Sequence, residues 1–391
     1  MKYDFDSVIN RRDTDSMKWD VEVNELPMWV ADMDYITAPE ILDALKERLD
    51  HGILGYPVIP GRWYDAYINW WKDRHDLAMK RESLVFCSGV IPAVSAMIRA
   101  FSLPGSNVLI EPPVYNCFFN IIKGNGRKVQ ESPLIYKNGA YERDFEELEK
   151  QMSDPETELM ILCNPQNPTG NIWKKEELAK IGELAEKHGV KIISDEIHCD
   201  LTEPGMGYVP FAAASPVCAD IGISFIAPTK AFNLAGLKTA AVYVCNEETR
   251  EKVKKALDTD ELSEPNAFAS TAAIAAFEKG GPWLDGLREY ISENRKTVYD
   301  FLHDELPQIH AVKGFATYLM WLDISGLKKD TDKFAAFLRK QTGLFLSPGV
   351  IFGQQGMDFL RMNIACPKSV LMDGLSRLKA GADEWMKKGE K

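Results

Sequence analysis

A lysine stands in a small and apolar neighbourhood at residues 226–238, IAPTKAFNLAGLK. Lysine normally lies at the solvent surface, because burying its charge costs free energy unless the charge is paired or removed. A desolvated lysine binds its proton less tightly and becomes a nucleophile that can form an imine with a carbonyl compound. Lys230 is therefore a candidate for covalent chemistry, and the alternative is an ordinary surface lysine at a turn.

Acidic and amide side chains follow two other apolar segments. Asp195 and Glu196 end the segment VKIISDE, and Asn164 and Asn167 lie in CNPQNPTGN, directly after a further apolar segment. Prolines stiffen the second loop and give the Asn167 amide a defined direction, suited to hydrogen-bonding a ligand oxygen. The alternatives are a helix cap or a solvated turn for each acid, and a purely structural loop for the asparagines.

A candidate anion site lies at CSGVIPAV, where an apolar segment is followed by Ser88, Gly89 and a helix that begins near Val90. The first N–H groups of a helix have no partner inside the helix, and they can bind an anion such as phosphate.

These groups together match one ligand, a phosphorylated aromatic aldehyde. Lys230 would form the imine, Asp195 would keep a ring nitrogen protonated, and Asn167 would hydrogen-bond a phenolic oxygen. The phosphate would lie at the helix that begins near Val90. The sequence therefore predicts pyridoxal 5′-phosphate (PLP), a cofactor that stores carbanion electrons in its ring.

The elements that must position these residues alternate between short apolar strands and amphipathic helices from about residue 84. In KKEELAKIGELAEKHG, for example, Leu178, Ile181, Ala185 and His188 fall along one helical stripe, and Gly189 closes the helix. This rhythm predicts a mostly parallel sheet with helices on both faces, and ligands in such sheets bind at the carboxyl ends of the strands.

The pattern changes near residue 283, where a long helix leads into separated strands and a terminal helix from Lys368. We expect residues 46–283 to form a large α/β domain, residues 284–391 a smaller α+β domain, and residues 1–45 an arm that packs on the smaller one.

Composition excludes several classes of partner. The chain has 391 residues and a formal net charge of −12, which argues against nucleic acid or an anionic membrane surface. Its first residues lack the apolar core of a signal peptide, and no stretch is long and apolar enough to span a bilayer. Seven scattered cysteines without a C-x-x-C pair predict a reduced, cytoplasmic protein without a structural metal site.

Several motifs in a fixed order carry a family resemblance. The Ser-Gly before a helix, NPQNPTG, SDEIH, TKAFNLAGLK and FLRMNIA resemble the fold-type I PLP enzymes of the class I/II aminotransferase superfamily. LPMWVADMDY, GYP, SDEIHCDL, PNAFASTAAIAAFEKGGPWLD and FLSPGVIFGQQGMDFLRMN resemble its MalY/PatB branch of cystathionine β-lyases. The resemblance covers residues 27–367. It implies an aspartate-aminotransferase-like fold, with a mainly parallel seven-stranded sheet and a smaller α+β domain.

The resemblance also implies particular functions for single residues. Lys230, Asp195 and Tyr115 would be catalytic, and Tyr115 would stack on the cofactor ring unless it is simply a core tyrosine. Arg361 would grip the substrate α-carboxylate, a task suited to a planar bidentate fork. The other expected contacts are Ser88, Gly89, Val90, Asn167 and Thr229 for the cofactor, and Val30, Ala31, Asn167 and Asn266 for the substrate.

Tyr56, in GILGYP, resembles a tyrosine that reaches the phosphate of the neighbouring subunit, so the resemblance implies a homodimer with shared active sites. The alternative is a loop tyrosine without that reach.

Three positions depart from the pattern of many aminotransferases in the superfamily. His198 replaces a tyrosine beside the ring oxygen, as in the lyase branch, or it is a structural histidine. Ala227 replaces a phosphate-binding serine, so that Thr229 or backbone groups must substitute. Lys238 replaces a phosphate-binding arginine, and the alternative there is a solvated lysine.

The function implied by the resemblance is elimination of a thiol such as homocysteine from L-cystathionine or a related cysteine S-conjugate, with pyruvate and ammonia as the other products. An aminotransferase would use the same residues but return the proton to the cofactor instead of expelling a leaving group. A third possibility is a regulatory protein that uses the enzyme fold to bind a partner. His198 and WVADMDY favour the lyase by resemblance, since residue spacing cannot separate these outcomes.

Overall fold

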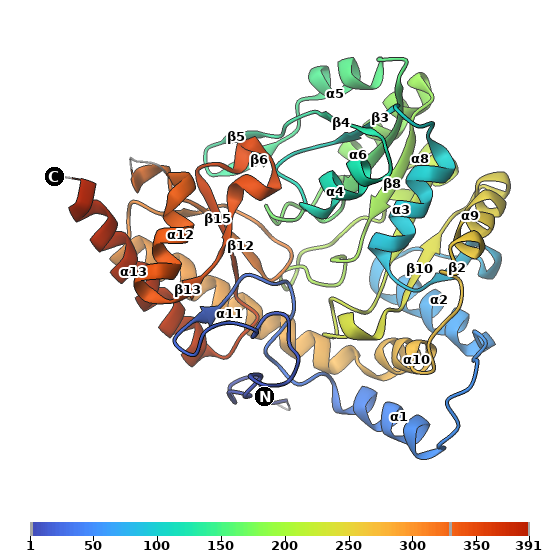
Figure 1. The fold of residues 1–391 in the computed structure, drawn as a ribbon. Helices are drawn as coiled ribbons and strands as arrows, with labels where there is room; N and C mark the ends of the chain where they lie inside the picture. Colours follow the sequence, from blue (N-terminus) through green and yellow to red (C-terminus); the bar gives the residue numbers. More distant parts are fainter. Residues whose placement is uncertain (1–2, 328–330, 390–391) are drawn as a thin grey trace.

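The computed structural model of the protein describes residues 3–327 and 331–389. Its largest sheet has seven strands in the order β2-β10-β9-β8-β7-β3-β4 (Figure 1). The strands are β2 (Leu84–Cys87), β3 (Asn107–Ile110), β4 (Lys128–Glu131), β7 (Thr157–Cys163), β8 (Lys191–Asp195), β9 (Gly222–Ile226) and β10 (Ala240–Tyr243). Only β10 runs antiparallel to its neighbours. The predicted seven-stranded, mainly parallel sheet is confirmed.

The central strands are apolar along their whole length because helices cover both faces of the sheet. In β7, Leu159 and Ile161 face one core and Met160 and Leu162 face the other. The first core includes residues of α3 (Val90–Phe101), α4 (Cys117–Gly124) and α9 (Glu247–Thr259). The second includes residues of α5 (Phe145–Met152), α6 (Lys175–His188), α7 (Phe211–Ala214) and α8 (Pro216–Ile221). The helix predicted in KKEELAKIGELAEKHG is confirmed as α6, and Gly189 ends it in the left-handed conformation, with φ +71°.

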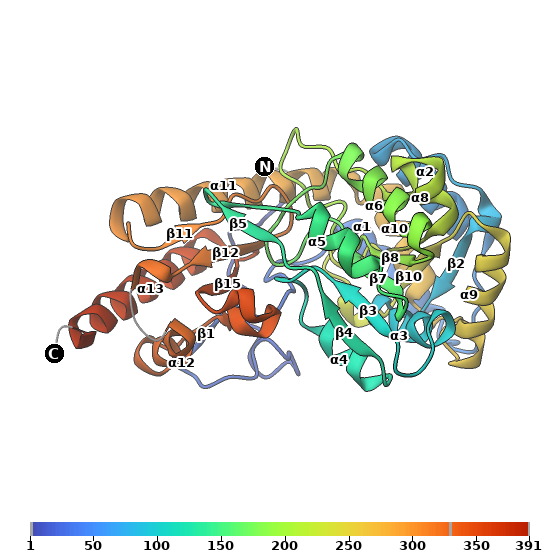
Figure 2. The same cartoon turned by 90° about the horizontal axis from the view of Figure 1, so that it is seen from above.

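A second sheet lies beside the first and has four antiparallel strands in the order β11-β12-β15-β14 (Figure 2). Its strands are β11 (His310–Ala311), β12 (Leu319–Asp323), β14 (Ser347–Pro348) and β15 (Phe359–Asn363), and its neighbouring helices are α11 (Gly281–Glu305), α12 (Thr331–Thr342) and α13 (Lys368–Gly389). Helix α11 links the two regions, as the two views show. The boundary expected near residue 283 falls within α11 and stays a prediction.

The N-terminal segment crosses to the second region, where β1 (Leu26–Pro27) pairs in parallel with β13 (Leu344–Phe345). The chain then returns through α1 (Pro39–Asp50) and α2 (Gly61–His75), which pack against α10 (Ala269–Lys279). A short hairpin of β5 (Ile135–Lys137) and β6 (Ala140–Glu142) completes the strands. Among the described residues, no helix is both long and apolar enough to cross a membrane.

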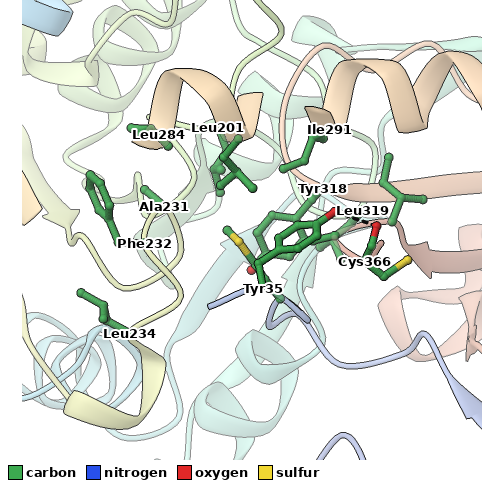
Figure 3. Close-up of a cluster of buried hydrophobic side chains, with 14 of the residues drawn as sticks. Tyr35, Leu201, Ala231, Phe232, Leu234, Leu284, Ile291, Tyr318, Leu319 and Cys366 are labelled. Carbon is green, nitrogen blue, oxygen red and sulfur yellow. Dashed lines mark hydrogen bonds between the residues drawn. The ribbon is translucent and has the colours of Figure 1, made fainter. Parts of the chain in front are cut away.

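A large apolar cluster joins these regions (Figure 3). It contains Tyr35 of the N-terminal segment, Phe232 of the loop after β9, Ile291 of α11 and Tyr318 beside β12. Because close packing of such residues restricts movement, this cluster fixes the lysine loop relative to the second sheet.

Candidate active site

A cavity of 170 Å³ lies at the carboxyl edge of the seven-stranded sheet. Strands β2, β3, β7, β8 and β9 all run toward this edge, so the loops that follow them converge there. Ten of the residues proposed from the sequence line the cavity: Ala31, Gly89, Val90, Tyr115, Asn167, Asp195, His198, Thr229, Lys230 and Lys238. The fold therefore brings together side chains from separate segments of the chain around one lysine.

Lys230 lies in the loop after β9, held by the turn bonds Phe232 N–H to Pro228 O and Leu234 N–H to Thr229 O. Its Nζ donates a hydrogen bond of 2.5 Å to the carbonyl oxygen of Ala31. The pKa of Lys230 is lowered to about 8, mainly by burial, and the positive charge of Arg361 lowers it further. A substantial neutral fraction near neutral pH makes this amine a nucleophile and a base, as the sequence suggested.

Asp195 ends β8 and is buried. Burial raises its pKa to about 6, while a hydrogen bond from the Ile197 N–H, 3.2 Å long, and the charge of Lys230 oppose the rise. A buried carboxyl group with so high a pKa is stabilised in its charged form by a cationic partner. A protonated ring nitrogen in the cavity would be such a partner.

Asn167 and Arg361 meet across the two sheets, although 194 residues separate them. Arg361 lies in the middle of β15 and donates from Nη1 to Asn167 Oδ1 (3.1 Å) and from Nη2 to Trp29 O (2.9 Å). Its Nε is buried and has no hydrogen-bond partner among the described residues. Burial lowers the pKa of Arg361 to about 10. A buried guanidinium with uncommitted N–H groups is suited to binding a carboxylate.

The cavity is open to the N-terminus of α3. Gly89 precedes that helix with φ +144°, a backbone conformation that residues with a side chain rarely adopt and that is strained for them. No side chain in the described part of the chain caps the helix, so its first N–H groups remain available to an anion. Thr229 is buried and Lys238 is exposed, and both line the cavity. Ser88 is half-buried and does not line the cavity.

Two ring side chains complete the wall. His198 is buried, and its pKa is lowered to about 3 by burial and by the charges of Lys230 and Arg361, so the ring is neutral. Its Nδ1 lacks a hydrogen-bond partner within the described residues. Tyr115 is half-buried, and burial raises the pKa of its hydroxyl.

Four more of the proposed residues do not line the cavity in this single chain: Arg361, Tyr56, Asn266 and Val30. Tyr56 is completely exposed, and Asn266 is exposed with its amide bound to the Leu237 carbonyl (2.7 Å). Val30 is next to the cavity-lining Ala31, and its own carbonyl accepts a hydrogen bond from Asn363 Nδ2 (2.6 Å).

Tyr318 was not foreseen from the sequence. Its hydroxyl donates to the Ala31 carbonyl (3.0 Å), the same acceptor that Lys230 uses, and its ring centroid lies 6.2 Å from that of His198. A single tyrosine beside a strand carries no signal of this contact, because the contact exists only where the second sheet meets the N-terminal segment.

The two sheets and the lysine–aspartate–asparagine site between them define an enzyme fold of the aspartate-aminotransferase type. The chain belongs to the family of class I and II aminotransferases, which matches residues 24–378. It is 43% identical to cystathionine beta-lyase PatB of Bacillus subtilis over 96% of this chain and 99% of that protein. It is 35% identical to protein MalY of Escherichia coli over 96% of this chain and 98% of that protein.

A solved structure points to the same group of enzymes. The PLP-bound C–S lyase from Staphylococcus hominis is 35% identical, has a TM-score of 0.92, and is matched over 98% of this chain and 99% of that chain. The resemblance to the MalY/PatB branch is therefore confirmed, and it extends over nearly the full chain.

Proposed function

We propose that the protein is a PLP-dependent carbon–sulfur β-lyase that releases a thiol, pyruvate and ammonia from L-cystathionine or a related cysteine S-conjugate. One observation carries the proposal: a lysine with a lowered pKa shares a cavity with Asp195 and lies within the electrostatic reach of Arg361, in a chain 43% identical to a cystathionine β-lyase. The lysine and the arginine supply the base and the carboxylate clamp that such an elimination needs.

The described residues fit PLP. Lys230 would bond its aldehyde carbon, and the uncapped start of α3 would hold the phosphate, with Thr229 and Lys238 close by. Asp195 would pair with the ring nitrogen, while Asn167 and His198 would lie beside the ring oxygen. When bound, PLP accepts into its ring the electrons released from the substrate Cα–H bond.

The protein's own groups would carry out the remaining tasks. Arg361 binds the α-carboxylate and so fixes the orientation of the amino acid. Lys230, as a neutral amine, takes the α-proton, and the bond from Cβ to sulfur then breaks because a thiolate is a good leaving group. His198 stays neutral, so it adds no positive charge to a site that already contains Lys230 and Arg361.

An aminotransferase remains the second candidate, because a PLP-bound putative aminotransferase from Clostridium difficile is also 35% identical, with a TM-score of 0.94. We expect the protein to produce pyruvate and a free thiol from L-cystathionine over many turnovers with no 2-oxo acid present. A strict requirement for 2-oxoglutarate, with glutamate formed in equal amount, would show that the protein is an aminotransferase instead.

We further propose a homodimer in which Tyr56 completes the partner's site. In the single chain, the loop after α1 exposes four large side chains: Ile53, Leu54, Tyr56 and Val58. A contiguous exposed apolar segment of this kind is typical of a protein interface. The division into residues 1–45, 46–283 and 284–391 is likewise a proposal, which the change of pattern along the chain supports.

A further inference from the structure

A short backbone segment, residues 28–33, crosses from the second sheet to the lysine loop; we call it the strap. Asn363 of β15 holds it at three points. Its backbone N–H donates to the Met28 carbonyl (2.9 Å), and its side-chain amide donates to the carbonyls of Val30 and Asp32 (2.6 Å each). The strap therefore has a fixed path along the edge of β15, with Ala31 lining the cavity.

The strap is also fixed from its outer side by a cluster of charges. Arg11 donates to the Met33 carbonyl (3.0 Å) and pairs with Asp32 and Asp34 (2.7 Å each). Lys18, which is almost fully buried, pairs with the same Asp34 at 2.7 Å. A buried lysine of this kind is tolerated only with a close counter-charge, so this end of the strap has little freedom to shift.

The Ala31 carbonyl differs from the carbonyls of Met28, Val30 and Asp32 because one of its two donors is Lys230, the proposed reactive lysine. Lys230 Nζ donates to it at 2.5 Å and Tyr318 OH at 3.0 Å. A carbonyl oxygen has two lone pairs and can accept both bonds. Lys230 must leave this carbonyl when it is engaged by the cofactor, whereas Tyr318 is anchored in the apolar cluster of Figure 3 and can stay.

We propose that Tyr318 is a positioning residue, which keeps the Ala31 carbonyl, and with it the strap, in place whenever Lys230 withdraws. The physical reason is that a partly buried carbonyl left without any protein donor is destabilised, while a carbonyl that loses one of two donors is still satisfied. The inference deepens the proposed function, on which it rests for the event that draws Lys230 away. The two donors therefore substitute for each other, and only the loss of both leaves the Ala31 carbonyl, at the middle of the strap, without a protein donor.

The first test needs no cofactor and so stands apart from the lyase assignment. Amide hydrogen exchange is measured for a peptide covering residues 28–34, where the N–H groups of Met28, Met33 and Asp34 are hydrogen-bonded. In cofactor-free protein, Lys230→Met and Tyr318→Phe should each change its exchange rate by less than about twofold. The double variant should raise the rate at least about fivefold, as expected for a carbonyl with no donor.

The second test uses Tyr318→Phe alone, compared with and without bound PLP. The substitution should speed exchange of the strap at least about threefold in the PLP-bound protein and leave the cofactor-free protein nearly unchanged, because Lys230 is a substitute donor only in the latter. Tyr299→Phe is the matched control, since it removes a similar hydroxyl-to-carbonyl bond (3.0 Å, to Val312) and Tyr299 does not line the cavity.

In the same PLP-bound proteins, Tyr318→Phe should raise the KM for L-cystathionine by about fivefold with a smaller change in kcat, because Ala31 lines the cavity. Tyr299→Phe should change neither constant. The proposal is wrong if strap exchange rises equally in the PLP-bound and cofactor-free Tyr318→Phe proteins, or if the effects of the two substitutions in the first test are merely additive. If PLP does not bind, or if cystathionine is not cleaved, the lyase assignment fails while the first test still decides the function of Tyr318.

Discussion

Arg361→Lys is the substitution that most directly tests the proposed carboxylate clamp. A guanidinium has five N–H groups, and only two of those on Arg361 are used within the described residues, by Asn167 and Trp29. Three N–H groups remain, the unpartnered Nε among them, and a bidentate pair with a carboxylate needs two. Lysine at this position keeps the charge but has no planar fork.

The magnitude follows from the number of bonds lost. A hydrogen bond to a charged group contributes about 1.5–3 kcal/mol, and a lysine would retain one such bond of the two. Loss of about 2 kcal/mol corresponds to a decrease of about 30-fold in kcat/KM. The assay is the initial rate of pyruvate formation from L-cystathionine by the purified, PLP-bound variant.

Arg74→Lys provides the matched control, because Arg74 forms a similar two-bond pair with Asp285 (2.5 and 3.0 Å) and, on α2, does not line the cavity. The kcat/KM of the Arg74→Lys variant should stay within about twofold of that of the unmodified protein, because a surface ion pair away from the cavity contributes little. If Arg361→Lys lowered kcat/KM by less than about threefold, Arg361 would not be the group that binds the α-carboxylate.

Three further predictions concern the cofactor, a buried acid and the assembly. The purified protein should absorb visible light, and borohydride should attach the cofactor to Lys230; a label on Lys238 or any other lysine would contradict the site. Burial raises the pKa of Glu196 to about 7 from a usual value near 4.5, so its contribution to stability is greatest at low pH and is lost as pH rises from about 4.5 to 7. The free energy of unfolding in urea, relative to that of Glu196→Gln, should therefore fall by about 3 kcal/mol over this range, and an unchanged difference would refute the shift. Mixing Tyr56→Phe and Lys230→Ala chains should restore activity in heterodimers, which contain one site with neither substitution, whereas inactive heterodimers would argue against a shared site.

The large sheet and the residues that follow its strands could be predicted from the sequence. Apolar runs, helical stripes and the closing Gly189 are local features, and they predict the elements correctly because each pattern agrees with the environment that the fold provides. Parallel strands carry the residues after them to one edge of the sheet. For that reason the positions of Lys230, Asp195 and Asn167 along the chain were enough to assign them to one site.

The way in which the second region and the N-terminal segment complete that site depends on contacts between distant parts of the chain, which the sequence does not reveal. The contact of Arg361 with Asn167 and the contact of Tyr318 with the Ala31 carbonyl join residues that are 194 and 287 positions apart, and no periodic pattern encodes such distances. The pKa values of Lys230 and Asp195 likewise depend on burial, which arises only when the separate segments pack around the cavity. Sequence thus identified the reactive groups, while packing set their charge state and the hydrogen bonds that hold them.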